Sequence, residues 1–383
     1  MADSTPTDEQ RELSLIGKVE MRIALTDTDA KLETQLKTYL APLLLKLSSP
    51  SPNVRNKVIT ICQHISTRVK PQSIQLPVAA LIKQYKEANH HLVRTFDLVY
   101  IQQGVGRLTT AQRAELLPVV AKGIAEGSGG EAQAQVFNLF LRLLESFVIP
   151  TRGSKEDVEL RGRLEVSEKD IDHLANWLGR LLLLVPRKQN DQGCPGLKPD
   201  ECSFLDLHCK EDIWNPSAGG LNLLRTKVLA ARLLASGLFT EKQRFLPALY
   251  ASSDAASSIS DIGDDMMKRT LPATDLENEI LLRELFELYF GDGIRPRAKV
   301  PLRMKILGLL SKSINSTTFA NSIMRLVDDG LGSRQMDGDD VVMGNGSARL
   351  VNIAHQSDPA AAELTLGTAA HACSPLELDS VRC

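Results

Sequence analysis

Aliphatic residues recur at spacings of three and four along most of this chain, from about residue 10 to residue 330. Such spacing places them on one face of an α-helix, and a series of these faces is buried best against other helices. Leucine dominates, with 58 copies among 383 residues, whereas aromatic residues make up only 4%. Because leucine loses little side-chain freedom in a helix, we predict an all-α protein. The two clearest faces are Leu32, Leu36, Leu40, Leu43, Leu44 and Leu47, then Val54, Val58, Ile61, Ile65 and Val69.

A short turn, residues 48–52, separates these two faces. Ser51 is expected to cap the second helix, with Pro52 at its first position, where a missing N–H costs nothing. Two amphipathic helices joined in this way form a helical hairpin. The same pattern predicts further helices with the faces Val78, Leu81, Ile82 and Tyr85; Leu92, Phe96 and Val99; Val136, Leu139, Phe140, Leu143, Leu144 and Phe147; Leu281, Leu285 and Leu288; and Leu302, Ile306, Leu309, Leu310 and Ile314.

A second signature points to repeats. An apolar residue, then proline, then small or apolar residues occurs at Pro42, Pro77, Pro118 and Pro247, at separations of 35, 41 and 129 residues, the last being three times 43. A basic residue follows three of these prolines, at Lys46, Lys83 and Lys122. Helix-pair repeats of the HEAT and armadillo kind have periods of about 40 to 47 residues and stack to bury their apolar faces. We predict a HEAT/armadillo-like helical-hairpin solenoid; the alternative is an irregular bundle in which proline merely starts helices.

The predicted organisation has three parts. Residues 1–10 are expected to form a flexible N-terminus, and residues 11–331 the solenoid. Within the solenoid, we expect a charged loop at residues 151–170 and a longer loop, rich in Gly and Pro, at about residues 187–220. Residues 332–383 are rich in Asp, Gly, Ala and Ser, with few aliphatic positions in register, which predicts a disordered or aberrant tail.

Charge and composition exclude several classes of protein. The formal net charge is −2, from 45 basic and 47 acidic residues, so nucleic acid is not expected as a partner. The polar N-terminus has neither the apolar core of a signal peptide nor the character of a transit peptide. No apolar run approaches the roughly 18 residues that a membrane span needs, so we expect no membrane insertion. Six cysteines without a secretory signal are typical of reduced thiols. We expect a cytoplasmic location, with the nucleus as a second one.

One cluster, Cys194, Cys202, His208 and Cys209, raises the hypothesis of a zinc site. Zinc ligands usually come in paired short knuckles such as Cys-x₂-Cys. Here the gaps are wide, and adjacent His208 and Cys209 hinder shared tetrahedral coordination. We favour a surface loop with incidental thiols. The acidic run at Asp337, Asp339 and Asp340 lacks the glutamate that closes a calcium loop, because Ala348 stands at its twelfth position.

No arrangement of residues indicates catalysis or a cofactor. His90 and His91 lie where a new helix begins, which favours a turn or cap role, and His64 beside Cys62 has no acidic partner to orient it as a base. The glycine pair Gly104 and Gly106 follows a helix rather than a strand, so it does not match a dinucleotide fingerprint. The glycines at 127–130 most simply end one helix before the next begins. We predict a non-enzymatic protein with no catalytic, cofactor-binding or metal site.

Charged residues near the turns fit a structural role instead. The segment from Ser252 to Arg269 contains several aspartates followed by Lys268 and Arg269. In HEAT repeats an Asp in the turn can cap the second helix, while basic residues contact the next repeat. Asn53 to Arg55 is a similar element in the first hairpin. We predict that these residues stabilise stacking.

Several segments resemble one family. They are Val19 to Leu25 with Asp27 and Asp29, Pro42 to Pro50, Val54 to Val58, Ile74 to Val78, and Ser257 to Arg269. Together they resemble the N-terminal portion of the large HEAT-repeat proteasome adaptor and scaffold family, in its fungal-like form. The resemblance covers about residues 10–331, is specific in the first hundred residues, and stops after Leu331. Family members are much longer.

This resemblance implies a non-enzymatic adaptor or scaffold that binds the proteasome and helps to hold or monitor the association of its core and regulatory particles. Because the resemblance covers only an N-terminal portion, a truncated form is one interpretation of the chain. The alternative is another HEAT-repeat interaction scaffold, such as a transport receptor or a phosphatase scaffold. An inner surface lined by acidic helices would favour the transport receptor, since such receptors bind basic signals.

Overall fold

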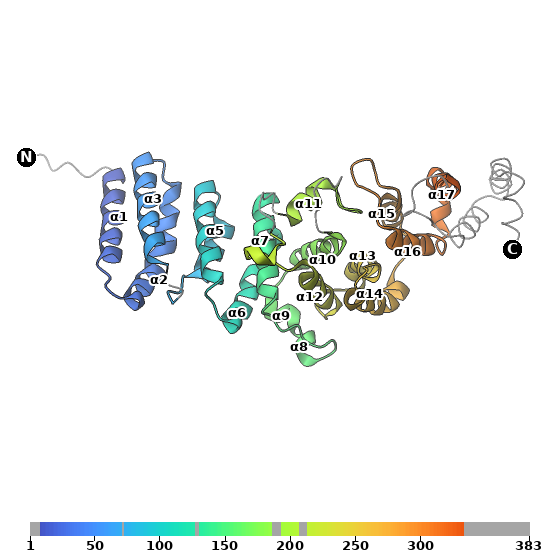
Figure 1. Ribbon diagram of the computed structural model, residues 1–383, viewed down its shortest axis with the longest axis horizontal. Coiled ribbons are helices and arrows are strands. Elements are labelled where there is room, and N and C mark those ends of the chain that lie inside the picture. Colours follow the sequence, from blue (N-terminus) through green and yellow to red (C-terminus); the bar gives the residue numbers. More distant parts are fainter. Residues whose placement is uncertain (1–7, 71–72, 127–129, 186–192, 207–212, 333–383) are drawn as a thin grey trace, which may run out of the picture. The chain divides into compact units, whose positions relative to one another are not determined.

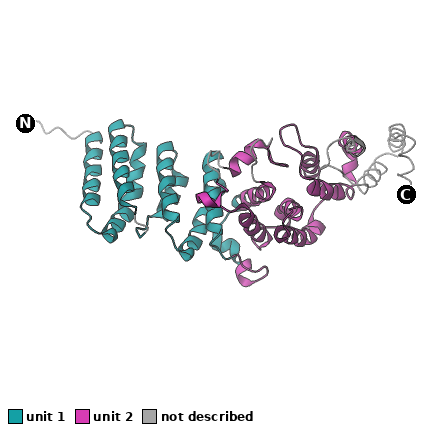
Figure 2. Cartoon of the chain, viewed as in Figure 1, with its two compact units in different colours: residues 1–148, 159–170 teal, residues 149–158, 171–383 magenta. Residues whose placement is uncertain are grey.

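The computed structural model describes residues 8–70, 73–126, 130–185, 193–206 and 213–332, and every regular element in these ranges is a helix (Figure 1). The chain divides into two compact units, residues 1–148 with 159–170 and residues 149–158 with 171–383 (Figure 2). The predicted all-α fold is therefore confirmed. The expected tail, residues 332–383, lies outside the described residues except for Gly332, and so do residues 1–7 of the expected flexible N-terminus.

Unit 1 is a series of helices linked by short turns. They are α1 (Asp8–Ala24), α2 (Asp29–Leu45), η1 (Lys46–Ser48), α3 (Pro52–Arg68), α4 (Val78–Glu87), α5 (His91–Val105), α6 (Thr110–Ala121), η2 (Ile124–Glu126), α7 (Gly130–Leu144) and α9 (Leu160–Leu164). In Figure 1 the longer helices from α1 to α5 stand side by side. The first helix starts at Asp8, so residues 8–10 are helical rather than part of a flexible N-terminus.

The first predicted hairpin is confirmed in detail. All eleven aliphatic residues of the two clearest faces are buried along α2, η1, α3 and its C-terminal cap. Ser51 caps α3 as expected, because its hydroxyl accepts a hydrogen bond from the Val54 N–H at 3.4 Å, and Pro52 is the first helical residue. Burial of each such side chain contributes about 1.5–3 kcal/mol relative to exposure, which makes these faces the main support of the hairpin.

The face expected on α5 is wrong. Val99 is exposed, and the buried row runs instead through Val93, Asp97, Tyr100 and Ile101. A carboxyl group interrupts this row, so the apolar pattern alone points to the wrong side of the helix. Its oxygen Oδ1 accepts a hydrogen bond from the Gln84 side chain of α4 at 2.9 Å, which pairs one buried polar group with another.

Unit 2 combines helical hairpins with less regular connections. Its elements are α8 (Lys155–Val158), α10 (Glu168–Leu183, whose first three residues belong to unit 1), α11 (Pro199–Leu205), η3 (Pro216–Ala218), α12 (Leu223–Ala235), α13 (Glu241–Ser252), α14 (Ser257–Thr270), η4 (Leu271–Ala273), α15 (Glu279–Phe290), α16 (Val300–Leu310), η5 (Asn315–Thr318) and α17 (Ala320–Gly332). The hairpin of α13 and α14 is especially close. A side chain at Gly263 would overlap the backbone of Ala251 and Ser252, so only glycine allows this approach.

Two expected loops contain helices. The segment 151–170 holds α8, α9 and the start of α10, each too short in sequence to show a clear apolar period. Within residues 187–220, α11 forms between the ranges 186–192 and 207–212, which lie outside the described residues, and η3 forms after the second of these ranges. The predicted face of α16 is buried, but Ile314 lies beyond the helix end at Leu310 and is exposed.

Candidate functional site

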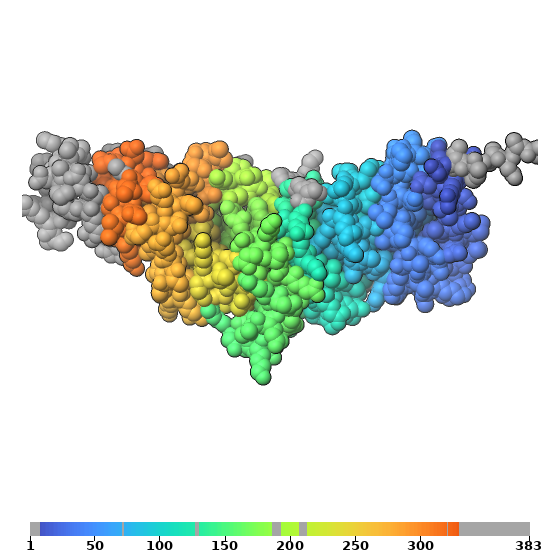
Figure 3. Space-filling view, turned by 180° about the vertical axis from the view of Figure 1, so that it is seen from behind, coloured from blue at the N-terminus to red at the C-terminus, as the bar shows by residue number. Residues whose placement is uncertain are grey.

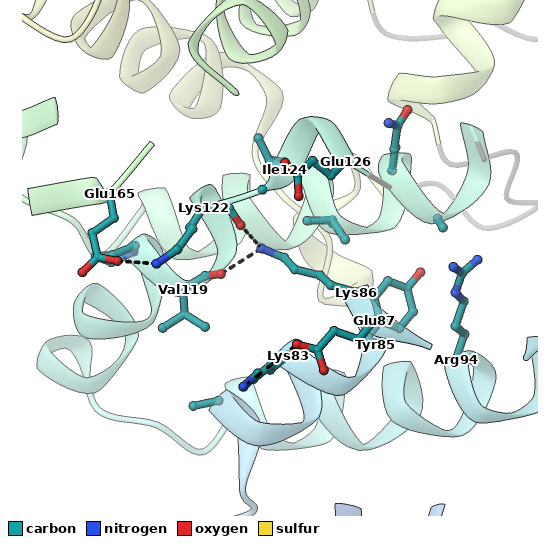
Figure 4. A pocket seen from close by; sticks show the side chains of 16 residues that line it. Lys83, Tyr85, Lys86, Glu87, Arg94, Val119, Lys122, Ile124, Glu126 and Glu165 are labelled. Atoms are coloured by element: carbon teal, nitrogen blue, oxygen red, sulfur yellow. Dashed lines mark hydrogen bonds and ion pairs between the residues drawn. The ribbon is translucent and has the colours of Figure 1, made fainter. Parts of the chain in front are cut away.

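A cleft of about 600 Å³ opens in unit 1 and is lined mainly by α4, α6, η2 and α7 (Figure 4). Its lining carries both signs of charge, with the cations Lys83, Arg94 and Lys122 and the anions Glu87 and Glu165 among others. Lys122 and Glu165 form an ion pair at 2.6 Å. This mixture of charges favours neither an anionic nor a cationic ligand.

Lys86 occupies the centre of this cleft. Its ammonium group donates hydrogen bonds to the backbone carbonyls of Val119, Val120 and Lys122, at 2.8, 2.7 and 2.6 Å. These carbonyls end α6, where the last turn of a helix has no partners of its own and carries partial negative charge. Burial lowers the pKa of Lys86 to about 8. Because all three N–H groups are already bonded, Lys86 joins α4 to α6 and is not available as a base or nucleophile.

The same arrangement occurs twice in unit 2. Lys227 of α12 donates to the Leu182 carbonyl near the end of α10 at 2.7 Å. Lys305 of α16 donates to the Ser252 carbonyl at the end of α13, also at 2.7 Å. We call Lys86, Lys227 and Lys305 the helix-end lysines. Each one binds the carboxyl end of a helix other than its own, so their shared role is to hold neighbouring helices together.

Aspartates complete the contacts of two helix-end lysines. Lys227 also binds Asp254 at 3.2 Å, and Lys305 binds Asp264 at 2.7 Å. Asp254 lies in the turn before α14 and accepts a hydrogen bond from the Ala256 N–H at 2.9 Å. The stacking role predicted for the segment from Ser252 to Arg269 is therefore confirmed for these aspartates. Arg269 instead pairs within α14, with Asp265 at 2.6 Å.

The first predicted element of this kind also serves packing. Arg55 donates to the carbonyls of Ser49 and Pro50 at 2.7 and 2.9 Å, and Asn53 donates to Glu9 of α1 at 2.9 Å. Among the basic residues that follow the proline signatures, Lys46 binds Glu12 of α1 at 2.6 Å. Lys83 instead approaches Glu87 of its own helix, at 4.0 Å.

Proline does not merely start helices, as the alternative of an irregular bundle supposed. Pro42, Pro118 and Pro247 lie inside α2, α6 and α13, and Pro77 is the residue before α4. A proline inside a helix removes one backbone hydrogen bond and bends the helix locally. Three of the four signature prolines therefore lie inside helices of different hairpins, which favours the repeat interpretation.

A further repeated motif escaped the sequence prediction. Thr109-x-x-Gln112-Arg113 and Thr240-x-x-Gln243-Arg244 each begin a helix with a reciprocal cap between Thr and Gln. The arginine that follows reaches back to the preceding helix. Arg113 donates to the Val105 and Gly106 carbonyls at 3.0 and 3.1 Å. Arg244 donates to the Ser236 and Phe239 carbonyls. In both places the Thr-x-x-Gln-Arg pattern comes shortly before a Leu-Pro pair, and this shared order is the sequence signal that would have revealed the motif.

Asp170 anchors the other side of the connection after α6. Its carboxylate accepts hydrogen bonds from the N–H groups of Gly123, Ala125 and Ser167 at 3.1, 3.0 and 3.0 Å, and from the Ser167 hydroxyl at 2.8 Å. Burial alone would raise its pKa, but these hydrogen bonds outweigh burial and the pKa is lowered. A fully bonded carboxylate of this kind is structural.

Two of the three cysteines considered for zinc are buried rather than exposed on a surface loop. Cys194 and Cys202 are both buried, and the Cys194 thiol contacts the Val185 N–H at 3.1 Å and the Leu183 carbonyl at 3.5 Å. A hydrogen bond with Cys202 and burial both raise the pKa of Cys194. His208 and Cys209 lie outside the described residues, as do Asp337, Asp339, Asp340 and Ala348. Within the described ranges, no three His, Cys, Asp or Glu side chains come together as metal ligands.

The remaining candidates have structural environments. Cys62 is buried, which raises its pKa to about 12, whereas His64 on the same helix is exposed. His90 stands at the cap position of α5, as expected, but its side chain makes no capping hydrogen bond. Gly104 lies in α5, where a side chain would overlap Val78 of α4. In the described part of the chain, no helix combines the length and apolar character needed to cross a membrane.

Stacked helical hairpins whose charges bind neighbouring helix ends define a class, the helical-repeat scaffold. The comparison with protein families then gives the family: the model described as "Proteasome component ECM29, N-terminal" matches residues 16–355, and the chain belongs to this family. The match continues past Leu331, so the expectation that the family resemblance stops there is wrong. No solved structure matches the chain significantly.

Curated relatives agree with this assignment. "Proteasome component ECM29" of Saccharomyces cerevisiae is 31% identical over 355 residues, which cover 87% of this chain and 19% of the relative. "Proteasome adapter and scaffold protein ECM29" of Homo sapiens is 25% identical over 360 residues, which cover 88% of this chain and 19% of the relative. The Drosophila melanogaster homologue is 28% identical over 327 residues, which cover 81% of this chain and 16% of the relative. The chain thus spans about a fifth of the length of these relatives, and the transport and phosphatase alternatives are not favoured.

Proposed function

We propose that this chain is a proteasome-binding scaffold region that acts without chemistry of its own and helps to hold or monitor the association of core and regulatory particles. The family match over residues 16–355 is the observation that carries the proposal. The names of its relatives, which include a proteasome adapter and scaffold protein, support the same role. The helix-end lysines support a binding function in one respect. Their ammonium groups bind neighbouring helices, so a partner would be recognised by other side chains on the helix surfaces.

Affinity capture from a native lysate tests this proposal. The full chain, tagged at its C-terminus, is used as bait, and the captured proteins are quantified by mass spectrometry. We expect core and regulatory particle subunits to be enriched together over a tag-only control. A folded bait that captures no proteasome subunits contradicts the proposal. Enrichment of nuclear transport or phosphatase subunits in their place would support the alternative scaffolds.

A further inference from the structure

The exposed side of α1 carries an apolar ridge. Leu15, Met21 and Leu25, the last just after the helix, are 50%, 64% and 77% exposed. One exposed aliphatic residue is ordinary, but several on one helix face form a patch that marks a binding surface. A helix at the end of a stack usually presents a polar outer face, and α1 is the first helix of the described residues. Figure 3 shows α1 in the darkest blue, beside the lighter blue of α2 and α3.

Basic residues flank this ridge. Arg11, Lys18 and Arg22 are exposed and share the ridge's side of the helix, at spacings of three, four and seven from its members. Within the described residues, Arg11 and Lys18 form no ion pair or hydrogen bond, whereas Arg22 lies over the Tyr39 ring at 5.5 Å. No acidic residue is exposed on α1 between Arg11 and its C-terminus. We call Arg11, Leu15, Lys18, Met21, Arg22 and Leu25 the α1 face.

Glu12 and Glu20, the acidic residues of α1 after Arg11, are directed to the other side. Glu12 binds Lys46 at 2.6 Å and Ser49 at 2.9 Å, and Glu20 binds Lys57 of α3 at 2.5 Å. From Arg11 onward the helix therefore separates its charges, with both carboxylates bonded inside unit 1 and the cations exposed beside aliphatic side chains. This separation is what a surface needs to attract an acidic partner, because the cations are not neutralised by their own helix.

We propose that the α1 face binds an acidic amphipathic helix of the proteasome, with aliphatic side chains against Leu15, Met21 and Leu25 and carboxylates against Arg11 and Lys18. This inference rests on the proposed function. From Leu15 to Leu25 the ridge rises by ten residue steps, or about 15 Å at 1.5 Å per residue, which suits a partner helix of about three turns in either direction. Such a helix would extend the stack by one element, burying the patch as neighbouring hairpins bury theirs.

Binding of the purified full chain to purified 26S proteasomes tests the inference. The variant Arg11→Glu/Lys18→Glu reverses both free cations with residues that suit a helix. The matched control Lys70→Glu/Lys169→Glu makes the same change of net charge at two exposed lysines elsewhere in unit 1. We expect the α1 variant to bind at least about ten-fold more weakly, since two favourable charge contacts become repulsive, and the control to bind like the wild type. Circular dichroism checks that both variants stay folded.

A second variant, Met21→Gln/Leu25→Gln, tests the apolar part. We expect its affinity for the proteasome to be about three- to ten-fold lower than that of the wild type. We also expect the wild type to bind more weakly as salt is raised from low to physiological concentration. Weak binding by the charge variant but wild-type binding by Met21→Gln/Leu25→Gln would overturn the amphipathic helix in favour of an extended acidic segment. Equal binding by all variants would overturn the inference and leave the proposed function intact. No binding by the folded wild type would overturn both.

Discussion

The two units hold their connecting segments in different ways. In unit 1, short turns join amphipathic helices, and cations such as Lys86 bind the free carbonyls at helix ends. Unit 2 also has helix-end lysines, but its irregular segments depend on buried charges. Glu201 of α11 accepts hydrogen bonds from Arg180 at 2.6 Å and Arg295 at 3.5 Å, and Glu201 and Arg295 are each only 6% exposed. Apolar periodicity thus builds a regular stack, whereas an irregular connection is fixed by paired charges.

The buried charges have a second contact that explains their position. The other oxygen of Glu201 accepts a hydrogen bond from the Lys198 N–H at 2.8 Å and so closes the first turn of α11. Nearby, the Gly196 N–H binds the Pro296 carbonyl at 3.1 Å. One carboxylate therefore ties residues 196–205 to α10 and to the segment after α15. Removing it should affect unit 2 far more than removing any single surface charge.

The largest expected effect is that of Glu201→Gln. It leaves Arg295 buried without its anionic partner, and breaking such a pair costs about 3–5 kcal/mol of unfolding free energy. Denaturant unfolding measures the change. Asp200→Asn, at an exposed neighbour in the same helix, is the matched control and should change stability by less than about 0.5 kcal/mol. Equal effects of the two substitutions would contradict the role given to the buried charges.

In unit 1 the corresponding test is Leu36→Ala, in the fully buried face of α2. The lost transfer energy and the cavity together should cost about 3 kcal/mol. Leu45→Ala, on the same helix but about half exposed, should cost less than about 1 kcal/mol. A similar loss at both positions would mean that the apolar face does not determine the stack. Thermal unfolding followed by circular dichroism distinguishes these results.

Asp97 predicts an unusual dependence on pH. Burial raises the pKa of this carboxyl to about 7, and one of its oxygens has no partner among the described residues. Between about pH 4 and pH 7 the folded chain keeps this proton while the unfolded chain releases it. The folded state therefore binds more protons, and its stability falls as pH rises through this window. The contribution of Asp97 should decrease by about 4 kcal/mol over these roughly three pH units.

Asp97→Asn should remove that contribution. Because other carboxylates titrate as well, the quantity to measure is the difference in unfolding free energy between variant and wild type at several pH values. We expect this difference to shift in favour of the variant as pH rises from 4 to 8. A difference that stays constant with pH would show that Asp97 titrates normally.

The smallest effects concern the helix-end lysines. Lys86→Met removes three hydrogen bonds to α6 and should cost about 1–2 kcal/mol, since water can replace part of the bonding. Lys305→Met removes one carbonyl contact and the contact to Asp264, so we expect a loss of about 1 kcal/mol. Lys83→Met, on the exposed side of α4, is the control and should be nearly neutral. If Lys86→Met changed stability as little as Lys83→Met, the packing role given to Lys86 would be wrong.

The sequence predicts the parts of this molecule that depend on repetition. The faces of α2, α3, α4 and α7 follow from spacing, and the cap at Ser51 follows from local chemistry. Prediction from the sequence fails where a polar residue occupies a core position, as Asp97 does in α5. It also fails at α11, a helix of seven residues. That element depends on the contacts of Glu201 with Arg180 and Arg295, the latter 94 residues away in sequence, and no local pattern reports such a pair.

The candidate site follows a similar division. The stacking role of the aspartates near Ser252 is predictable from the spacing of turns and charges. The contacts of Lys86 are not, because its partners are backbone carbonyls 33 to 36 residues away, which carry no side-chain signature. The α1 face is hidden for another reason. Its residues look like an ordinary amphipathic helix until the structure shows which side the glutamates occupy.

The central claim is that this chain binds proteasomes through its surface. Sedimentation of the purified chain with purified 26S proteasomes, at physiological salt, measures this most directly. We predict that the chain moves into the proteasome fractions, and that an excess of unlabelled chain displaces a labelled one. A chain that is folded by circular dichroism and remains at the top of the gradient at micromolar concentrations of both components would contradict the account.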